Sequence, residues 1–265
     1  MLESLFQTLY FWFKGWHFAV GERLCAPITE FLPGSISPHC PRFFDGFFTT
    51  FELVVLALVL AFGLAKVLTR LPILGPPWLA SVIGVYVYVF QGTPLLIQLW
   101  LVYFGLAQFE WIQASSLWLF LASGWWVGLL VLTLNSAAYQ TNILTGGVRN
   151  LSQGQFEGAD SLGLSERLKY HRILFPQALR ASWPALANES ILLLKASALV
   201  STITVLDLMG HARTVFSRSY DLSVYGGAAI LYIMLTALIT LLAYLIRRYG
   251  FASLPSDPWF RGLTR

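Results

Sequence analysis

Five long apolar segments, separated by shorter polar ones, dominate the hydrophobic pattern of this 265-residue chain. They cover approximately residues 46–69, 78–107, 115–148, 177–203 and 226–246. A membrane-spanning helix needs roughly 20 predominantly apolar residues, so each segment is long enough to cross a bilayer. The pattern therefore predicts an all-α integral membrane protein with about five transmembrane helices.

Composition and charge agree with a membrane protein. Of all residues, 57% are hydrophobic and 11% are charged, and the mean hydropathy is +0.66. The bases flank the spans and form no stripe with interleaved aromatic residues, which argues against a nucleic-acid partner. Most of them lie on the side that holds the loop after the third span and the C-terminus. Since Lys and Arg are enriched in cytoplasmic loops, this side is predicted to be cytoplasmic and the N-terminus to lie opposite.

A polar stretch at residues 155–176 separates the third and fourth spans. Gly163 suits the left-handed position that ends a short helix begun near Gln155. Ser165 is placed to cap a second helix, Glu166 suits its first turn, and Pro176, which has no N–H, is expected to close it. The stretch is interpreted as two short helices that offer a docking element to a partner. A solvated loop that only joins two spans is the alternative.

The second span is interrupted by Gly92, Thr93 and Pro94. Pro94 removes one helical hydrogen bond and leaves a carbonyl unpaired one turn earlier. Such a break survives in lipid only against protein or a water-filled cavity, so this point is expected to line the interior. A plain packing kink is the alternative.

Polar residues also occur inside the third and fourth spans. Asn135 and Tyr139 lie one turn apart on the third, and the fourth contains Asn188, Glu189 and Lys195. Glu189 and Lys195 are six residues apart, so they lie on different helix faces and form no simple one-turn ion pair. Charges at this depth indicate a functional site by default. For the third span, hydrogen bonds that only hold helices together are the alternative. For Glu189 and Lys195, structural charges bridged to other helices or subunits are the alternative.

The two ends of the chain differ from the spans. Residues 1–45 are predicted to form an interfacial amphipathic piece followed by a loop, and residues 251–265 a polar tail. Cys25 and Cys40, the only cysteines, both lie in the first of these segments. They could form a disulfide in an oxidising compartment, and two unpaired thiols are the alternative.

Motifs of covalent chemistry are absent from the sequence. No glycine is followed by lysine, so there is no phosphate-binding P-loop, and neither a nucleophile elbow nor an HExxH motif occurs. The four histidines lack metal-ligand spacing. The chain is therefore predicted not to be an enzyme and to bind no metal or cofactor of its own.

The polar stretch resembles, position for position, the EAA loop of importer-type ABC permeases at Glu157, Ala159, Gly163, Ile173 and Pro176. Gly158 stands where that loop has its middle alanine, and Phe175 where it has a leucine. In that family the loop is the coupling helix, which sits in a cleft on a cytosolic ATPase. The resemblance thus implies ATPase coupling for Glu157, Gly158, Ala159, Asp160, Gly163 and Pro176.

Two further segments resemble polar amino acid permeases. Residues 92–98 (GTPLLIQ) are similar to their "RGTPLL-Q" signature, and residues 134–139 to their "LNSAAY" segment. Asn188-Glu189 with residues 193–199 resembles the subgroup that serves histidine, lysine, arginine, ornithine and opines. The usual arginine before the GTP is Gln91 here, so a gate built on its charge is in doubt. The resemblance implies substrate contacts from Asn135, Tyr139, Asn188, Glu189, Lys195 and Ser197.

The resemblance covers residues 46–250 and implies the type I (MetI-like) permease fold in a bacterial inner membrane, with a periplasmic N-terminus and a cytoplasmic C-terminus. The implied partners are a second permease chain, identical or paralogous, two ATPases that carry ATP and Mg²⁺, and a periplasmic binding protein. The implied substrate is a polar, basic amino acid. An ion- or proton-coupled secondary carrier, a structural scaffold and a non-binding partner in a heterodimeric permease are the alternatives.

Overall fold

The computed structural model describes residues 15–27, 30, 34 and 36–250, and every regular element within them is a helix. After a helix at residues 15–25 come η2 (Ser37–His39), α2 (Cys40–Leu74), α3 (Trp78–Gly92), α4 (Leu95–Trp100), η3 (Leu101–Gly105), α5 (Glu110–Gln113), α6 (Trp118–Leu121) and α7 (Gly124–Arg149). The second half contains α8 (Gln153–Ser161), α9 (Glu166–Lys169), η4 (Tyr170–Leu174), α10 (Phe175–Ser197), η5 (Ala198–Ile203), α11 (Leu208–Ser219), α12 (Ser223–Leu245) and η6 (Ile246–Gly250).

Three continuous helices in the described part of the chain are long and apolar enough to cross a membrane: 37–74, 166–203 and 223–250. A fourth crossing results if α3 and residues 95–105, which are bent by 103° at the break between them, form one broken span. α7, with 26 residues, lies where the third span was predicted, but it is not among the helices that are apolar enough to count as a crossing. Its second half contains polar residues, and Asn135, Ser136 and Gln140 among them are buried. The all-α membrane fold is confirmed.

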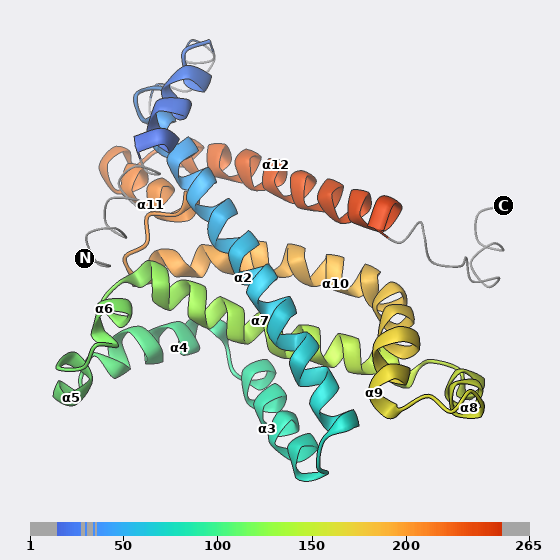
Figure 1. Ribbon diagram of the computed structural model, residues 1–265. Coiled ribbons are helices and arrows are strands. Elements are labelled where there is room, and N and C mark those ends of the chain that lie inside the picture. The colour runs from blue at the N-terminus through green and yellow to red at the C-terminus, as the bar shows by residue number, and fades with distance from the viewer. Residues whose placement is uncertain (1–14, 28–29, 31–33, 35, 251–265) are drawn as a thin grey trace.

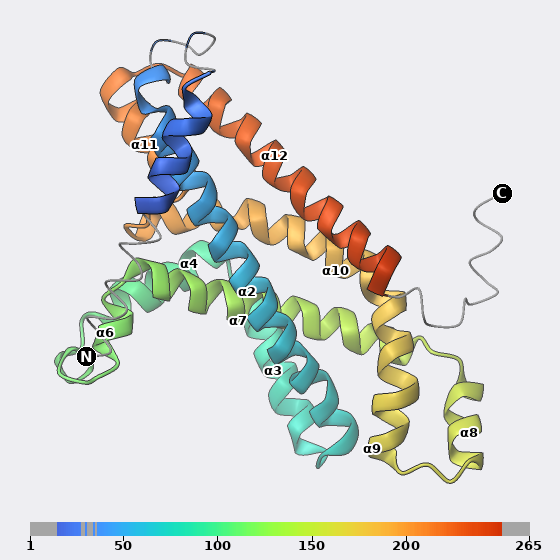
Figure 2. The ribbon, with the colours of Figure 1, turned by 45° about the horizontal axis from the view of Figure 1, so that its top comes forward.

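The long helices cross one another in a bundle with two distinct ends (Figure 1). α2 runs through the centre and contacts α7, and α10 lies beside α7 and also contacts α12. The helix at residues 15–25, the start of α2 and α11 gather at one end (Figure 2). α8 and α9 project from the other. The chain thus brings its N-terminal part and the predicted docking element to opposite ends of the bundle.

Tight contacts at small residues bring α7 and α10 together. Gly147 of α7 faces Ser182 of α10 so closely that a Cβ on Gly147 would collide with the serine hydroxyl. Small residues at such crossings let helix backbones approach, which favours association in lipid. Leu132 of α7 and Leu193 of α10 also belong to one buried apolar cluster.

Two predicted span boundaries are wrong. The third span was expected from residue 115, but α7 begins at Gly124, because Ser123 takes an extended conformation (ψ 119°) at its N-cap. The first span was expected to end near residue 69, which is too early. α2 continues to Leu74 with Pro72 inside it, and the Gly75 N–H donates to the Leu71 carbonyl at 2.8 Å. Pro72 has no N–H to donate to the Leu68 carbonyl, so it removes one helical hydrogen bond near the end of α2.

Candidate functional site

The end of α8 has the geometry that the sequence predicts. Gly163 has a φ of +66°, in the left-handed region that glycine enters without steric cost. Its N–H donates to the Asp160 carbonyl at 2.9 Å, and the Leu164 N–H donates to the Ala159 carbonyl at 3.3 Å. This pair of bonds is a Schellman motif, which satisfies carbonyls left free at a helix end. Gly163 therefore fixes the bend between α8 and α9.

A buried lysine joins the two helices across this bend. Lys169 Nζ lies 2.6 Å from Asp160 Oδ1 and 2.7 Å from Glu166 Oε1, and the lysine is only 6% exposed. Charge-assisted bonds of this length are among the stronger polar contacts in proteins. Sequence reasoning placed Asp160 on the partner-facing surface and missed Lys169. The spacing of Glu166 and Lys169 along one helix was the available signal.

Pro176 does not close the second short helix, as the sequence analysis expected. α9, η4, α10 and η5 form one continuous helix over Glu166–Ile203, with Pro176 at the start of α10. Residues 170–174, directly before the proline, form a π-helical turn. Its wider hydrogen-bond register gives the proline ring room and removes the need for a Pro176 N–H donor.

Ser165 occupies the predicted N-cap position but forms no side-chain cap. The Ser165 carbonyl accepts the first hydrogen bond of α9, from the Lys169 N–H at 2.9 Å.

The surface of α8 divides into a buried and an exposed side. Ala159 is 2% exposed, whereas Glu157, Gly158 and Asp160 are exposed. A Cβ placed on Gly158 would meet nothing within 4 Å, so the alanine found there in the resembling loop would fit. The exposed residues are the ones that a docking partner can reach.

A layer of polar bonds fills the break in the second span. Pro94 leaves the Phe90 carbonyl without its helical donor, and this carbonyl accepts from Gln98 Nε2 at 3.0 Å and from Asn135 Nδ2 at 3.1 Å. Asn135 also donates to Gln98 Oε1 at 3.1 Å, and Gln98 donates to the Thr93 carbonyl at 3.1 Å. The break is thus stabilised by side chains from α4 and α7, as a polar group removed from water requires.

Helix α3 is attached to the same stretch of α7. Tyr86 Oη donates to the Leu134 carbonyl at 2.5 Å, and Gln91 Nε2 donates to the Ala138 carbonyl at 3.3 Å. Residues 134–138 therefore accept bonds from α3 while Asn135 bonds across the break. Gln91, which departs from the arginine of the resembling signature, has a structural bond here.

Glu189 lies in the contact between α10 and α7. It is 6% exposed, and its Oε1 accepts from Ser136 Oγ at 3.0 Å. Gln140 Nε2 donates to the same serine oxygen at 3.1 Å. Sequence reasoning found Glu189 but missed Ser136 and Gln140, since small polar residues inside a span do not reveal which helix they face.

The other predicted substrate residues are not gathered around Glu189. Asn188 and Lys195 are exposed on α10, and Tyr139 is 36% exposed on α7. Ser197 is buried and donates to its own helix, to the Leu194 carbonyl at 2.8 Å. In this conformation the structure joins Asn135 to the helix break and Glu189 to Ser136, and it leaves three of the six side chains at the surface of the chain.

The sequence of residues 57–250 matches the family of binding-protein-dependent transport system inner membrane components. This match covers more than half of the chain. The chain belongs to this family. It is an ABC importer permease, and the all-helical fold and the geometry of residues 153–176 described above agree with that membership.

Relatives support the same assignment. The permease is 43% identical over 195 residues to the arginine ABC transporter permease protein ArtM of Haemophilus influenzae. These 195 residues cover 73% of this chain and 86% of that protein. It is 36% identical over 215 residues to ArtM of Escherichia coli K12, covering 81% and 96%. It is 38% identical over 194 residues to the octopine transport system permease protein OccM of Rhizobium radiobacter, covering 73% and 78%.

Solved structures share its fold. A crystal structure of an amino acid ABC transporter with histidines superposes with a TM-score of 0.70 at 31% identity, covering 81% of the permease and 96% of that chain. An inward-facing structure of the MetNI methionine ABC transporter gives a TM-score of 0.68 at 18% identity, covering 80% and 97%, and supports the fold alone.

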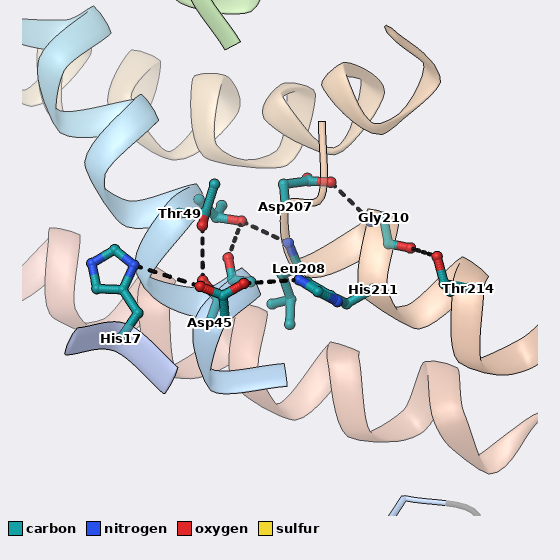
Figure 3. A network of polar contacts seen from close by, with 10 residues as sticks. His17, Asp45, Thr49, Asp207, Leu208, Gly210, His211 and Thr214 are labelled. Carbon is teal, nitrogen blue, oxygen red and sulfur yellow. Dashed lines mark hydrogen bonds and ion pairs between the residues drawn. The ribbon is translucent and has the colours of Figure 1, made fainter. Parts of the chain in front are cut away.

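A second polar cluster (Figure 3) lies where the helix at residues 15–25, α2 and α11 gather, at the end opposite to α8 (Figure 2). Asp45 of α2 stands between two imidazoles, with its Oδ2 3.2 Å from His211 Nε2 and its Oδ1 3.7 Å from His17 Nδ1. His17 Nε2 also lies 2.9 Å from Glu52 Oε1. Within the described residues no three His, Cys, Asp or Glu side chains gather as metal ligands. The cluster instead joins the helix at residues 15–25 and α11 to α2.

A disulfide holds the same end together. The structure pairs Cys25, at the end of the first described helix, with Cys40, the first residue of α2, with their Cα atoms 6.0 Å apart. Residues 15–25 are therefore a helix fixed to α2. Residues 1–14, which belong to the segment predicted to begin with an amphipathic piece, and the predicted tail at 251–265 lie outside the described residues.

We expect the thermal stability of the permease to fall as the pH rises from about 6.5 through about 9. Burial alone lowers the pKa of His17, but Asp45 and Glu52 outweigh it and raise the pKa from 6.5 to about 9. A group whose folded pKa is raised contributes stability that is complete below its unfolded pKa and is lost as pH rises through the folded one. The measurement is the unfolding midpoint of the purified permease between pH 6 and 10.

The control is His17→Gln, which is expected to flatten this part of the profile. Burial also raises the pKa of Asp207 from 3.8 to about 7, although hydrogen bonds from backbone N–H groups partly offset this rise. Ionisation of Asp207 therefore lowers stability between pH 3.8 and about 7, mostly below the pH range in which His17 loses its proton. A wild-type profile that His17→Gln leaves unchanged above pH 7 would contradict the assignment.

Proposed function

We propose that this permease is the translocation subunit of an ATP-driven importer, assembled with a second permease chain, two ATPase subunits and a periplasmic binding protein. The observation that carries the proposal is the coupling segment, residues 155–176, which is stiffened by Gly163 and Lys169 and is continuous with α10. ATP and Mg²⁺ belong to the ATPase, and this chain catalyses nothing itself.

The continuous helix Glu166–Ile203 supplies a physical link between partner and membrane. A force on α8 passes through Lys169 to α9 and along a continuous helix, which contains the π-helical turn at 170–174 and Pro184, to Glu189. Tyr170, which is fully buried, and Phe175 pack this helix into one core with Ala65 and Leu144. A helix held in a close-packed core moves together with that core. Closure of two ATPases would therefore rock α10 against α7.

The orientation follows from the same proposal. The coupling segment must face the ATPase, so the end with α8 is cytoplasmic, together with the C-terminal end of α12. The end with the disulfide then faces the periplasm, where a disulfide persists. The excess of Lys and Arg at the α8 end supports this orientation.

We propose a basic amino acid as the substrate. The relatives named above carry arginine and octopine in their names, and Glu189 is the only acidic residue of α10. When α10 moves away from Ser136, the Glu189 carboxylate would meet a cationic group. Tyr139, Asn188 and Lys195 are exposed and free to join such a site, whereas both amide hydrogens of Asn135 are already donated.

Glu189→Gln is expected to reduce arginine uptake by about tenfold or more while reducing glutamine uptake far less. Removing one charge of a partly desolvated ion pair costs a few kcal/mol, and each 1.4 kcal/mol is a factor of ten. The amide keeps the size of the side chain and its bond to Ser136. Uptake of both labelled amino acids into proteoliposomes that contain the whole complex is the measurement.

Lys195→Gln serves as the matched control for charge removal on the same helix, and it should not lower arginine uptake selectively. Equal losses of arginine and glutamine uptake in Glu189→Gln would remove the side-chain role. No loss of either would favour a heterodimer in which this chain is the non-binding partner.

A further inference from the structure

A cavity of about 720 Å³ opens beside the coupling segment, between the last turns of α2 and the start of the continuous helix that contains α9. Lys66 and Arg70 of α2 line one side, and Arg167 and His171 line the other. Leu71 and Leu74 form an apolar part of the wall. The cavity therefore combines several bases with a short apolar surface.

The positive charge in this cavity is only partly neutralised by the described protein. No described carboxylate forms an ion pair with Lys66, Arg70 or Arg167. Glu166 also lines the cavity, and it shares the single charge of Lys169 with Asp160, so these three groups together carry one negative charge. Lys66 lies over the face of Phe175, with its Nζ 5.5 Å from the ring centroid. The cavity therefore keeps an excess of positive charge, an arrangement that like-charge repulsion disfavours unless an anion is bound.

The cavity lies where the lipid-facing surface of α2 ends. Val59 is 64% exposed and Val67 51% exposed on that helix, as expected of residues against acyl chains. Trp78, at the start of α3 just beyond Gly75, is 62% exposed, and exposed tryptophans are typical of the headgroup region. A ligand in the cavity would have its anionic group among the bases and its apolar part along α2.

We propose that this cavity binds the phosphate headgroup of an acidic phospholipid, with the acyl chains against the exposed apolar face of α2. Arginine pairs with phosphate through two parallel N–H···O bonds, and lysine adds a point charge. Basic cavities at the ends of membrane helices are suited to anionic headgroups. The lipid would stabilise the contact between α2 and α9, next to the segment that couples to the ATPase. The inference does not depend on the transported substrate.

The experiment uses the intact complex in nanodiscs of phosphatidylcholine, alone or mixed with phosphatidylglycerol. Thermal unfolding is measured for the wild type, for Arg70→Gln with Arg167→Gln, and for Arg149→Gln with Arg172→Gln. The last pair removes the same charge from exposed arginines outside the cavity. Inorganic phosphate added to pure phosphatidylcholine nanodiscs tests a free anion.

We expect phosphatidylglycerol to raise the unfolding midpoint of the wild type and of the Arg149/Arg172 control, and the cavity variant to lose this rise. Arg70→Lys with Arg167→Lys should restore part of it, which separates binding from misfolding. An equal rise in the cavity variant, or none in the wild type, would overturn the proposal. A rise with phosphate alone would assign the cavity to a free anion. If the ATPase covers the cavity, lipid would have no effect on the wild type. None of these outcomes depends on uptake, so the proposed transport function is tested separately.

Discussion

Replacing Gly163 by valine is expected to abolish ATP-driven uptake and to weaken ATPase binding by about tenfold or more, while the membrane helices stay folded. A non-glycine residue in the left-handed region costs roughly 1–2 kcal/mol, and a β-branched one costs more. Gly163 has a φ of +66°, and its N–H donates one of the two hydrogen bonds of the bend, so the cost falls on the coupling segment alone. Since about 1.4 kcal/mol is a factor of ten in affinity, the ATPase should be lost on purification.

Gly158→Ala is the matched control, because Gly158 is helical and a Cβ there meets nothing. Alanine is favoured over glycine within a helix by about 1 kcal/mol, so this variant should keep the ATPase. If Gly163→Val retained the ATPase and full uptake, the coupling role of the segment would be wrong. If Gly158→Ala lost both, the surface of α8, and not its end, would control docking.

Asn135→Ala is expected to destabilise the permease by about 1–3 kcal/mol without any substrate present, because it leaves buried polar groups with fewer partners. Asn135 Nδ2 bonds both to the Phe90 carbonyl and to Gln98 Oε1. The helix break would lose one of its two supporting side chains. The unfolding midpoint of the purified, substrate-free complex is the measurement.

Asn142→Ala removes the same side chain from an exposed position on the same helix and should leave the midpoint unchanged. If both variants unfold like the wild type and Asn135→Ala only weakens substrate binding, Asn135 is a substrate ligand and not a support of the break. A lowered midpoint together with normal uptake per folded complex would establish the structural role.

The sequence was sufficient for the features that depend on a single residue's backbone preference. Pro94 cannot donate a hydrogen bond, so the break in the second span and the unpaired Phe90 carbonyl follow directly. Gly163 tolerates a positive φ, so the end of α8 follows as well. The apolar spans could also be predicted, because the length and hydropathy of a segment are local properties of the sequence.

The features that sequence reasoning missed depend on where helices meet. Pro176 was expected to end a helix, but the π-helical turn before it depends on how Tyr170 packs into the core. Ser136 and Gln140 are ordinary residues until α10 brings Glu189 against them. In the sequence Lys169 is only one of several basic residues. It is buried because the bend between α8 and α9 brings Asp160 into contact with it.

Transport by this permease is expected to be driven by ATP through the coupling segment. The most direct measurement is uptake of labelled arginine by proteoliposomes that contain the permease, its ATPases and its binding protein, with and without ATP and with ionophores that remove ion gradients. The proposal predicts uptake that requires ATP, survives the ionophores and is lost in Gly163→Val. Uptake without ATP that the ionophores abolish would contradict it and would assign the chain to the ion-coupled carriers.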